Sequence, residues 1–146
     1  MEPHAFLFRE GRWRVAGEHC DGAGKRTPVE GETRIRHAPD KWRSESVMRL
    51  KAASSPEHRN VYEIEPFSPN AQSTHWSSEH PSLGALRGRF VVSGDAILSF
   101  YGSATGRYRG FECIQRRDAT RYAVHGAMLE EDKVLSTWAV ELELQA

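Results

Sequence analysis

The segment from Leu86 to Gly102 reads Leu-Arg-Gly-Arg-Phe-Val-Val-Ser-Gly-Asp-Ala-Ile-Leu-Ser-Phe-Tyr-Gly. Two runs of strand-forming residues flank Ser93-Gly94-Asp95, and residues of these types favour a tight turn. The pattern therefore predicts a β-hairpin. The same alternation of apolar and polar residues, broken by turn residues about every 10 to 15 positions, extends from about Phe6 to Leu144.

Ten strands are predicted from this rhythm. Short turns between consecutive runs favour antiparallel neighbours, and a meander of this length tends to close into a barrel. The predicted fold is all-β, a calycin-like antiparallel up-and-down barrel of about ten strands, forming one domain over residues 1–146. The predicted strands are Arg12 to His19, Val29 to Arg36, Trp42 to Lys51, Asn60 to Phe67, Ser73 to Ser78, Ala85 to Val92, Ala96 to Ser103, Tyr108 to Gln115, Tyr122 to Leu129 and Val134 to Leu144.

Helical alternatives are limited. The last strand contains good helix formers, but its apolar residues recur with a period of two, which is typical of a strand. A single helical turn is compatible with the N-terminus or with Ser82 to Gly84.

Composition excludes several classes of function. Twenty basic and twenty acidic residues cancel, so no net field attracts nucleic acid or an anionic membrane. No apolar run is long enough to span a bilayer, and the start of the sequence lacks the pattern of a secretory signal, which predicts a cytoplasmic location. Cys20 and Cys113 stand far apart and outside any metal-ligand spacing, so we expect two reduced thiols and no metal site.

Strand alternation separates an inner face from an outer face, because successive side chains point to opposite sides. The inner sets combine tryptophans with several hydroxyl side chains. Polar groups dispersed over an interior favour a cavity for a small molecule, although such groups also occur near barrel rims or bonded to backbone. Tyr62 with Ile64, or Val61 with Phe67, could form the inner face of the fourth strand. In the late strands the predicted inner residues are Phe111, Cys113, Tyr122, Val124, Met128 and the row containing Trp138.

These inner faces give the candidate ligand-binding residues. Large aromatic side chains would form the wall of the cavity, and small hydroxyl side chains would orient a partly apolar ligand. The aromatic candidates are Trp13, Trp42, Trp76, Tyr101 and Trp138, and the polar candidates are Thr33, Ser44 and Ser46.

Gly11-Arg12-Trp13, at the start of the first predicted strand, resembles the Gly-X-Trp signature of the calycin superfamily, which includes lipocalins, fatty-acid-binding proteins and avidins. The resemblance implies that Trp13 closes one end of the barrel, with Arg116 or Arg121 packed across it. A barrel of ten strands resembles the fatty-acid-binding and nitrobindin-like branch of this superfamily more than the eight-stranded lipocalins. Two departures are visible: no two-helix lid follows the first strand, and Val15 and Gly17 leave the fuller nitrobindin glycine pattern incomplete.

Other functions remain open from the sequence. Seven histidines are scattered, and a single one could ligate haem. His75 and His80 have opposite parity on a strand, so they could share a metal only if a β-bulge intervened. No nucleophile elbow, phosphate loop or zinc motif is present. A small hydrolase or isomerase could still act at the barrel mouth, with Tyr101, Glu63 or His37 as the acid–base group.

A third interpretation is a structural or interaction barrel that pairs as a homodimer. The leading prediction is a protein that binds a small molecule, with no nucleic-acid or membrane partner, and the sequence identifies no cofactor.

Overall fold

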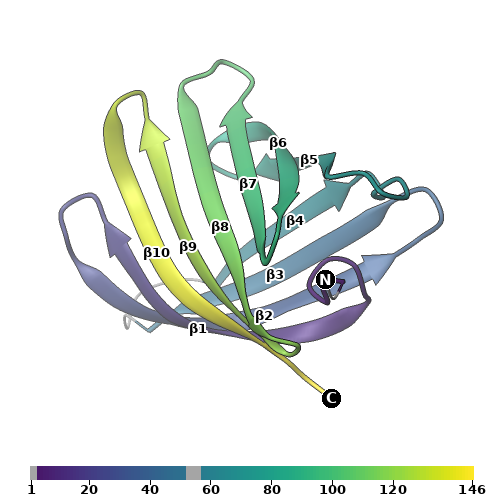
Figure 1. Ribbon diagram of the computed structural model, residues 1–146. Coiled ribbons are helices and arrows are strands. Elements are labelled where there is room, and N and C mark those ends of the chain that lie inside the picture. Colours follow the sequence, from purple (N-terminus) through teal and green to yellow (C-terminus); the bar gives the residue numbers. More distant parts are fainter. Residues whose placement is uncertain (1–2, 52–56) are drawn as a thin grey trace.

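Ten antiparallel strands close into a barrel in the computed structural model, which describes residues 3–51 and 57–146 (Figure 1). Each strand pairs with its neighbours in sequence, and β1 pairs with β10 to complete the ring. The prediction of an all-β, up-and-down antiparallel barrel is confirmed. The strands are β1 (Gly11–Asp21), β2 (Arg26–His37), β3 (Trp42–Leu50), β4 (Glu57–Ile64), β5 (Ser73–His80), β6 (Gly84–Ser93), β7 (Ala96–Ser103), β8 (Tyr108–Asp118), β9 (Arg121–Glu130) and β10 (Lys133–Leu144).

The turns follow the predicted chemistry. Gly94 and Gly106 adopt φ values of 57° and 76°, the left-handed region that glycine enters without steric cost. Strand β4 ends at Ile64, whereas the sequence predicted Phe67. The strand ends before Pro66 because proline has no N–H to donate to the β ladder. The two places compatible with a helical turn form hydrogen-bonded turns instead. Within the described residues, no helix is long and apolar enough to cross a membrane.

The two ends of the barrel differ. At one end, called here the closed end, the N-terminal residues 4–8 fold across the opening beside the β2–β3, β4–β5 and β6–β7 connections. At the other end, called here the mouth, lie the β1–β2, β7–β8 and β9–β10 hairpins and the β5–β6 turn (Figure 1). Strands β4 and β5 pair only through Glu63 with Ser77 and Ile64 with Trp76, so their ladder does not reach the mouth.

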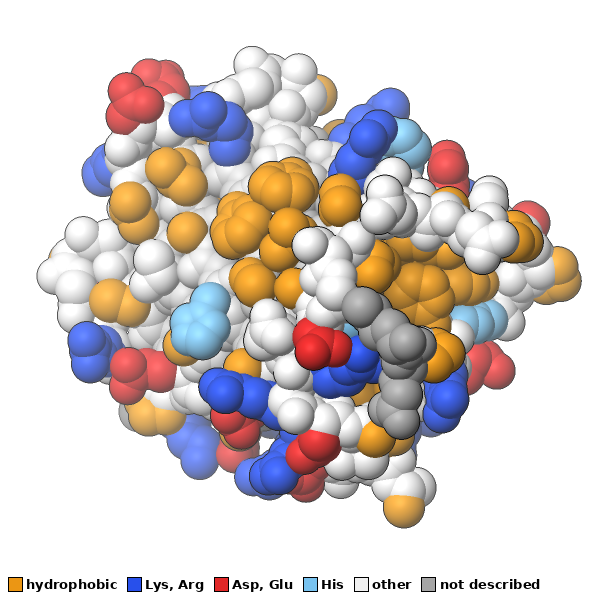
Figure 2. All heavy atoms as spheres, in the orientation of Figure 1, with side chains coloured by type: hydrophobic (Ala, Val, Ile, Leu, Met, Phe, Trp, Pro, Cys, Tyr) orange, Lys and Arg blue, Asp and Glu red, His pale blue; other side chains and the backbone are white. Residues whose placement is uncertain are grey.

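One predicted inner face is wrong. On β8 the residues predicted to point inward, Phe111 and Cys113, lie on the outer face, and Glu112 and Ile114 point into the barrel. Phe111 is 37% exposed and packs against Phe100, which is 47% exposed, at a ring-centroid distance of 5.2 Å. Figure 2 shows hydrophobic side chains gathered over the region of β7 and β8 on this face of the molecule.

On β4 the structure selects one of the two open alternatives. Ile64 is fully buried and Tyr62 lines the interior, whereas Val61 is 38% exposed. The outer wall carries cross-strand ion pairs such as Arg43 with Glu63 and Lys51 with Glu30. Pairs of this exposed kind contribute little to stability, so the fold is held mainly by its interior.

Candidate ligand-binding site

The barrel encloses a cavity of about 550 Å³ that extends from the mouth toward the closed end. This volume lies within the range of pockets that hold small organic molecules. Toward the closed end, the wall formed by β6 and β8 to β10 is apolar and includes Phe90, Ile114, Val124 and Leu142. The wall formed by β2 and β3 carries hydroxyl groups instead, including Thr33 beside Trp13 in the β1–β2 register.

The closed end is sealed by aromatic packing and paired polar groups. Trp13 is 1% exposed, and its ring meets Phe6 and Tyr122 edge-on at 5.4 and 5.6 Å. His4 bonds to the Tyr122 hydroxyl at 2.7 Å through Nδ1 and to the Gly94 carbonyl at 2.9 Å through Nε2. Since a carbonyl only accepts, the proton is on Nε2, and desolvation by burial lowers the pKa of His4.

A second contact holds the N-terminal segment in place. Leu7 is buried with φ of 70°, a conformation that leucine rarely adopts. His37 Nε2 donates to the Leu7 carbonyl at 2.7 Å, and the His37 ring stacks on Trp42 at 4.0 Å. Surrounding contacts thus fix a backbone conformation that is unfavourable on its own.

Three interior aromatic rings lie flat on cross-strand glycines. Tyr101 covers Gly110, and a Cβ placed there would be 2.1 Å from the ring. Trp138 covers Gly126 in the same way, with a corresponding distance of 2.3 Å. These glycines are needed because any side chain would displace the ring into the cavity. A third pair, Trp76 on Gly88, repeats the arrangement.

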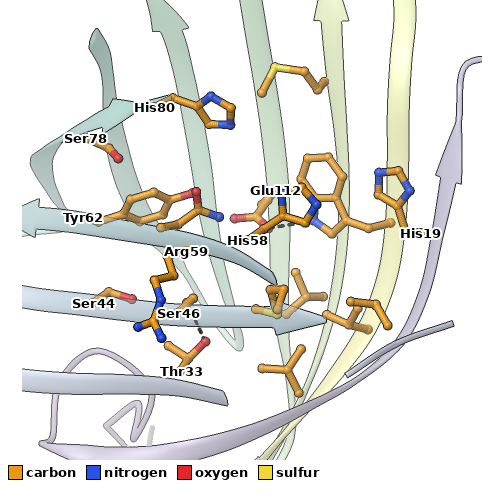
Figure 3. A pocket seen from close by; sticks show the side chains of 18 of the residues that line it. His19, Thr33, Ser44, Ser46, His58, Arg59, Tyr62, Ser78, His80 and Glu112 are labelled. Atoms are coloured by element: carbon orange, nitrogen blue, oxygen red, sulfur yellow. Dashed lines mark hydrogen bonds between the residues drawn. The ribbon is translucent and has the colours of Figure 1, made fainter. Parts of the chain in front are cut away.

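Glu112 is the central polar residue of the cavity. It lies opposite Gly126 in the β8–β9 register, and one carboxylate oxygen, Oε2, accepts a hydrogen bond of 2.8 Å from Trp138 Nε1. Desolvation inside the barrel raises the pKa of Glu112, and the Trp138 bond offsets part of that effect. Figure 3 shows its carboxylate directed across the cavity toward the ring of Tyr62.

Two tyrosines accompany this carboxylate. Tyr62, on β4, stacks on Trp76 at 4.4 Å, and Tyr101, on β7, packs against the same indole at 5.3 Å. Burial raises the pKa of both phenols, and the nearby Glu112 carboxylate raises them further. Both hydroxyls therefore remain protonated and can donate a hydrogen bond.

Hydroxyl side chains line β2 and β3. Thr33 and Ser46 face each other across the strand pair, with their hydroxyl oxygens 2.7 Å apart. Ser44 lies next to Tyr62 in the β3–β4 register, and Asn60 lies next to Ser46. The sequence-predicted polar side chains thus occupy one continuous arc of the cavity wall.

Histidines surround the mouth. His19, His58 and His80 all line the cavity there (Figure 3). Desolvation lowers the pKa of His19 and His80, and the charge of His58 lowers both further. His80 Nδ1 accepts from the backbone N–H groups of Ser82 and Leu83. Among residues 3–51 and 57–146, no group of three or more potential ligands is arranged to hold a metal ion.

The structure separates the eight candidate residues into two groups. Thr33, Ser44, Ser46, Tyr101 and Trp138 lie on the cavity wall. The other three pack elsewhere: Trp13 seals the closed end, Trp42 lies between His37 and Phe8, and Trp76 lies behind the Tyr62 ring.

The three acid–base candidates named from the sequence lie in different parts of the barrel. Glu63 bonds to Lys41 on the outer wall, and His37 binds the N-terminal segment, so only Tyr101 faces the cavity. Sequence reasoning missed Glu112 because alternation assigns a charged residue between Phe111 and Cys113 to the outside. Gly110, two residues before it on the same face, is the signal that could have found it, since an interior glycine accommodates a neighbouring ring.

The two cysteines and the two arginines named from the sequence lie as follows in the structure. Cys20 and Cys113 are free and partly exposed. Arg121 pairs with Asp118 at the surface, and Arg116 binds Asp95. The rings of Phe6 and Tyr122 pack on Trp13.

The fold and its interior define the class of protein, a calycin-like ten-stranded barrel with an internal cavity. No protein-family model and no curated protein matches the chain by sequence. In structure the chain is similar to the S-type phycobiliprotein lyase CPES from Guillardia theta, with a TM-score of 0.67 and 9% sequence identity over 93% of this chain and 87% of that one. At this identity the likeness shows the shared fold.

Proposed function

We propose that the protein binds a small, partly apolar molecule inside the barrel. The observation that carries this proposal is the cavity of about 550 Å³, with an apolar wall toward the closed end and the polar groups of Glu112, Tyr62 and Tyr101. An interior filled by its own side chains would need no such polar groups, because each buried polar atom without a partner costs about 1–3 kcal/mol.

The comparison with known structures is compatible with this proposal. One similar solved structure is that of a phycobiliprotein lyase. At 9% identity its activity does not transfer to this chain. The proposal therefore rests on the cavity and its side chains.

A second candidate function is favoured by Glu112. A carboxyl group with a raised pKa inside a cavity is a candidate general acid, as in hydrolases and isomerases. If the protein is an enzyme, Glu112→Gln abolishes turnover of a bound substrate while binding persists. Binding without turnover by the natural protein favours the first candidate.

The experiment combines native mass spectrometry with an absorption spectrum of freshly purified protein. A stoichiometric extra mass supports the proposal and identifies the ligand by its mass. N-phenyl-1-naphthylamine, a neutral apolar fluorophore, then provides a titration that does not depend on copurification. We expect saturable binding of one molecule per chain.

A matched pair of variants locates the bound molecule. Ser136 lines the cavity near the mouth, whereas Thr137, its neighbour on β10, is exposed on the outer face. Ser136→Trp should fill the cavity and abolish probe binding, and Thr137→Trp should leave binding unchanged. A clean apo mass together with no saturable probe binding overturns the proposal.

A further inference from the structure

Glu112 forms no ion pair with the described residues. Among residues 3–51 and 57–146, none of the salt bridges includes Glu112, and Arg59, which also lines the cavity, is exposed at the start of β4. Its one protein partner is the neutral indole N–H of Trp138. A carboxylate placed in a low-dielectric cavity without a cation is unfavourable, so this position is better explained by something that binds there.

The atoms around this carboxylate are arranged for a donor. A carboxylate can accept about four hydrogen bonds, and Glu112 accepts one in the described part of the chain. The Tyr62 and Tyr101 hydroxyls face the same space and have no hydrogen-bond partner among the described residues. Each hydroxyl oxygen can also accept, so three oxygen-bearing side chains are available to one group with several N–H bonds.

The surrounding surface is aromatic. The rings of Trp138, Tyr62 and Tyr101 line the cavity next to Glu112 and come from three different strands. Glycines beneath Trp138 and Tyr101 hold these two rings flat against the sheet, so that ring faces rather than edges bound the space. Faces of aromatic rings attract cations through their quadrupole, which adds to the attraction of the carboxylate.

The remaining wall specifies the body of the ligand. On the closed-end side of Glu112, β8, β9 and β10 present Ile114, Val124, Val140 and Leu142, and β6 adds Phe90. Besides Glu112, the Asp, Glu, Lys and Arg residues that line the cavity in the described part of the chain are Glu57 and Arg59, at the start of β4. Around Glu112 the site therefore combines a carboxylate, aromatic faces and an apolar wall toward the closed end.

We propose that the ligand is a cationic amine with an apolar body, whose ammonium group binds Glu112 between the rings of Trp138, Tyr62 and Tyr101. The inference rests on the proposed function, because it names the ligand class of the same cavity. Fatty acids and other carboxylates are disfavoured, since their anionic group would have to pass or approach the Glu112 carboxylate.

The test uses three ligands that share one chain and differ only in the head group: decylamine, decanol and decanoic acid. Each competes with N-phenyl-1-naphthylamine at neutral pH, and calorimetry measures the direct binding of each. We expect decylamine to bind about tenfold or more tightly than decanol, with decanoic acid weakest, because a charge-assisted bond in a shielded site exceeds a neutral one.

Two isosteric variants assign the effect to one residue. Glu112→Gln keeps an acceptor for Trp138 and removes the charge, and should reduce decylamine affinity about tenfold while decanol affinity changes little. Glu141→Gln makes the same change on the exposed face of β10 and should leave all three affinities unchanged. Circular dichroism confirms that both variants are folded.

The outcomes separate the two proposals. Probe and decanol binding without a preference for decylamine overturns the amine inference and leaves the ligand-binding proposal intact. A decylamine preference that persists in Glu112→Gln also overturns the inference, because the charge would act from elsewhere. No saturable binding of the probe or of any of the three ligands overturns the proposed function itself.

Discussion

The closed end and the mouth of this barrel use the same kinds of residue in opposite ways. At the closed end, His4 and Tyr122 bond to each other and to backbone, and Trp13 is 1% exposed, with its Nε1 buried and without a hydrogen-bond partner among the described residues. Halfway to the mouth, Glu112 and Tyr101 carry polar atoms that the described chain does not pair. The two regions differ in access: side chains fill the first, which favours stability, whereas the polar atoms of the second face the cavity and are open to a ligand.

The largest expected effect comes from a matched pair of tryptophan truncations. Trp13→Ala should lower the free energy of unfolding by about 3–5 kcal/mol, because it leaves a void among fully packed rings. Trp138→Ala should lower it by roughly 1 kcal/mol, since that ring already borders an open cavity. Urea denaturation followed by far-UV circular dichroism measures both values.

Equal losses for the two variants would contradict the division between a packed end and an open half. For probe binding we expect the opposite order, with the larger loss in Trp138→Ala. Trp138→Ala should abolish saturable probe binding or weaken it severely, whereas folded Trp13→Ala should retain it, because Trp13 does not line the cavity.

The second comparison removes one hydroxyl from each region. The Tyr122 hydroxyl bonds to His4 and accepts from the Ala5 N–H at 3.2 Å, so Tyr122→Phe leaves two buried groups without a partner. We expect a loss of about 1–2 kcal/mol. Tyr101→Phe should change stability by less than about 0.5 kcal/mol, because its hydroxyl has no partner among the described residues.

Chemical denaturation of the two variants in parallel gives the result. For decylamine affinity we expect the opposite order: Tyr101→Phe should weaken binding more than Tyr122→Phe, since only Tyr101→Phe removes a group that faces the cavity. A large destabilisation by Tyr101→Phe would show that its hydroxyl has a structural role and would weaken the division.

Much of this arrangement is predictable from sequence, and the exceptions have physical causes. Alternation and turn residues located the strands, because a strand with one buried face must alternate. The same rule failed at Glu112, where a charged residue points inward against the pattern. Functional positions are expected to break local rules, so the failure lies where the candidate site is.

The tryptophans show a second limit. Alternation assigned Trp13 and Trp76 to the interior, where both are buried. It carries no information about height along the barrel axis or about residues 4–8, which cover Trp13 and Trp42 at the closed end. Whether a buried tryptophan lines the cavity wall therefore depends on tertiary packing that no local sequence pattern encodes.

A third prediction concerns the charge of Glu112. Its pKa is raised by desolvation, so the ionised form destabilises the folded state above that pKa, and the penalty vanishes below the ordinary value of 4.5. Glu112→Gln should therefore be more stable than the natural protein at neutral pH, on the order of 1 kcal/mol. The advantage should shrink as the pH falls toward 4.5.

Urea denaturation at neutral pH and near pH 4.5 measures this change, with Glu141→Gln as the exposed control. A loss of stability in Glu112→Gln at neutral pH would mean that the carboxylate is satisfied within the apo protein. The comparison between a filled closed end and a centre that is open to a ligand would then be wrong at its most important residue.

The smallest expected effect is the pH dependence of the histidines. Burial lowers the pKa of His4 at the closed end and of His19 and His80 at the mouth, each from 6.5. The unfolded chain therefore binds more protons between the lowered values and 6.5, and stability should fall as the pH drops through this window.

The double variant His19→Gln/His80→Gln should reduce this slope. The slope is measured as the change in the urea denaturation midpoint between about pH 7 and about pH 5, the range in which histidines usually titrate. His125→Gln, on the exposed outer face of β9, should not change it. The residual slope in the double variant combines His4, whose neutral ring is held by Tyr122 and Gly94, with Glu112, whose raised pKa acts with the opposite sign. If the slope is unaffected by the double variant, protonation of His19 and His80 does not destabilise the folded protein, and the prediction for the mouth is wrong.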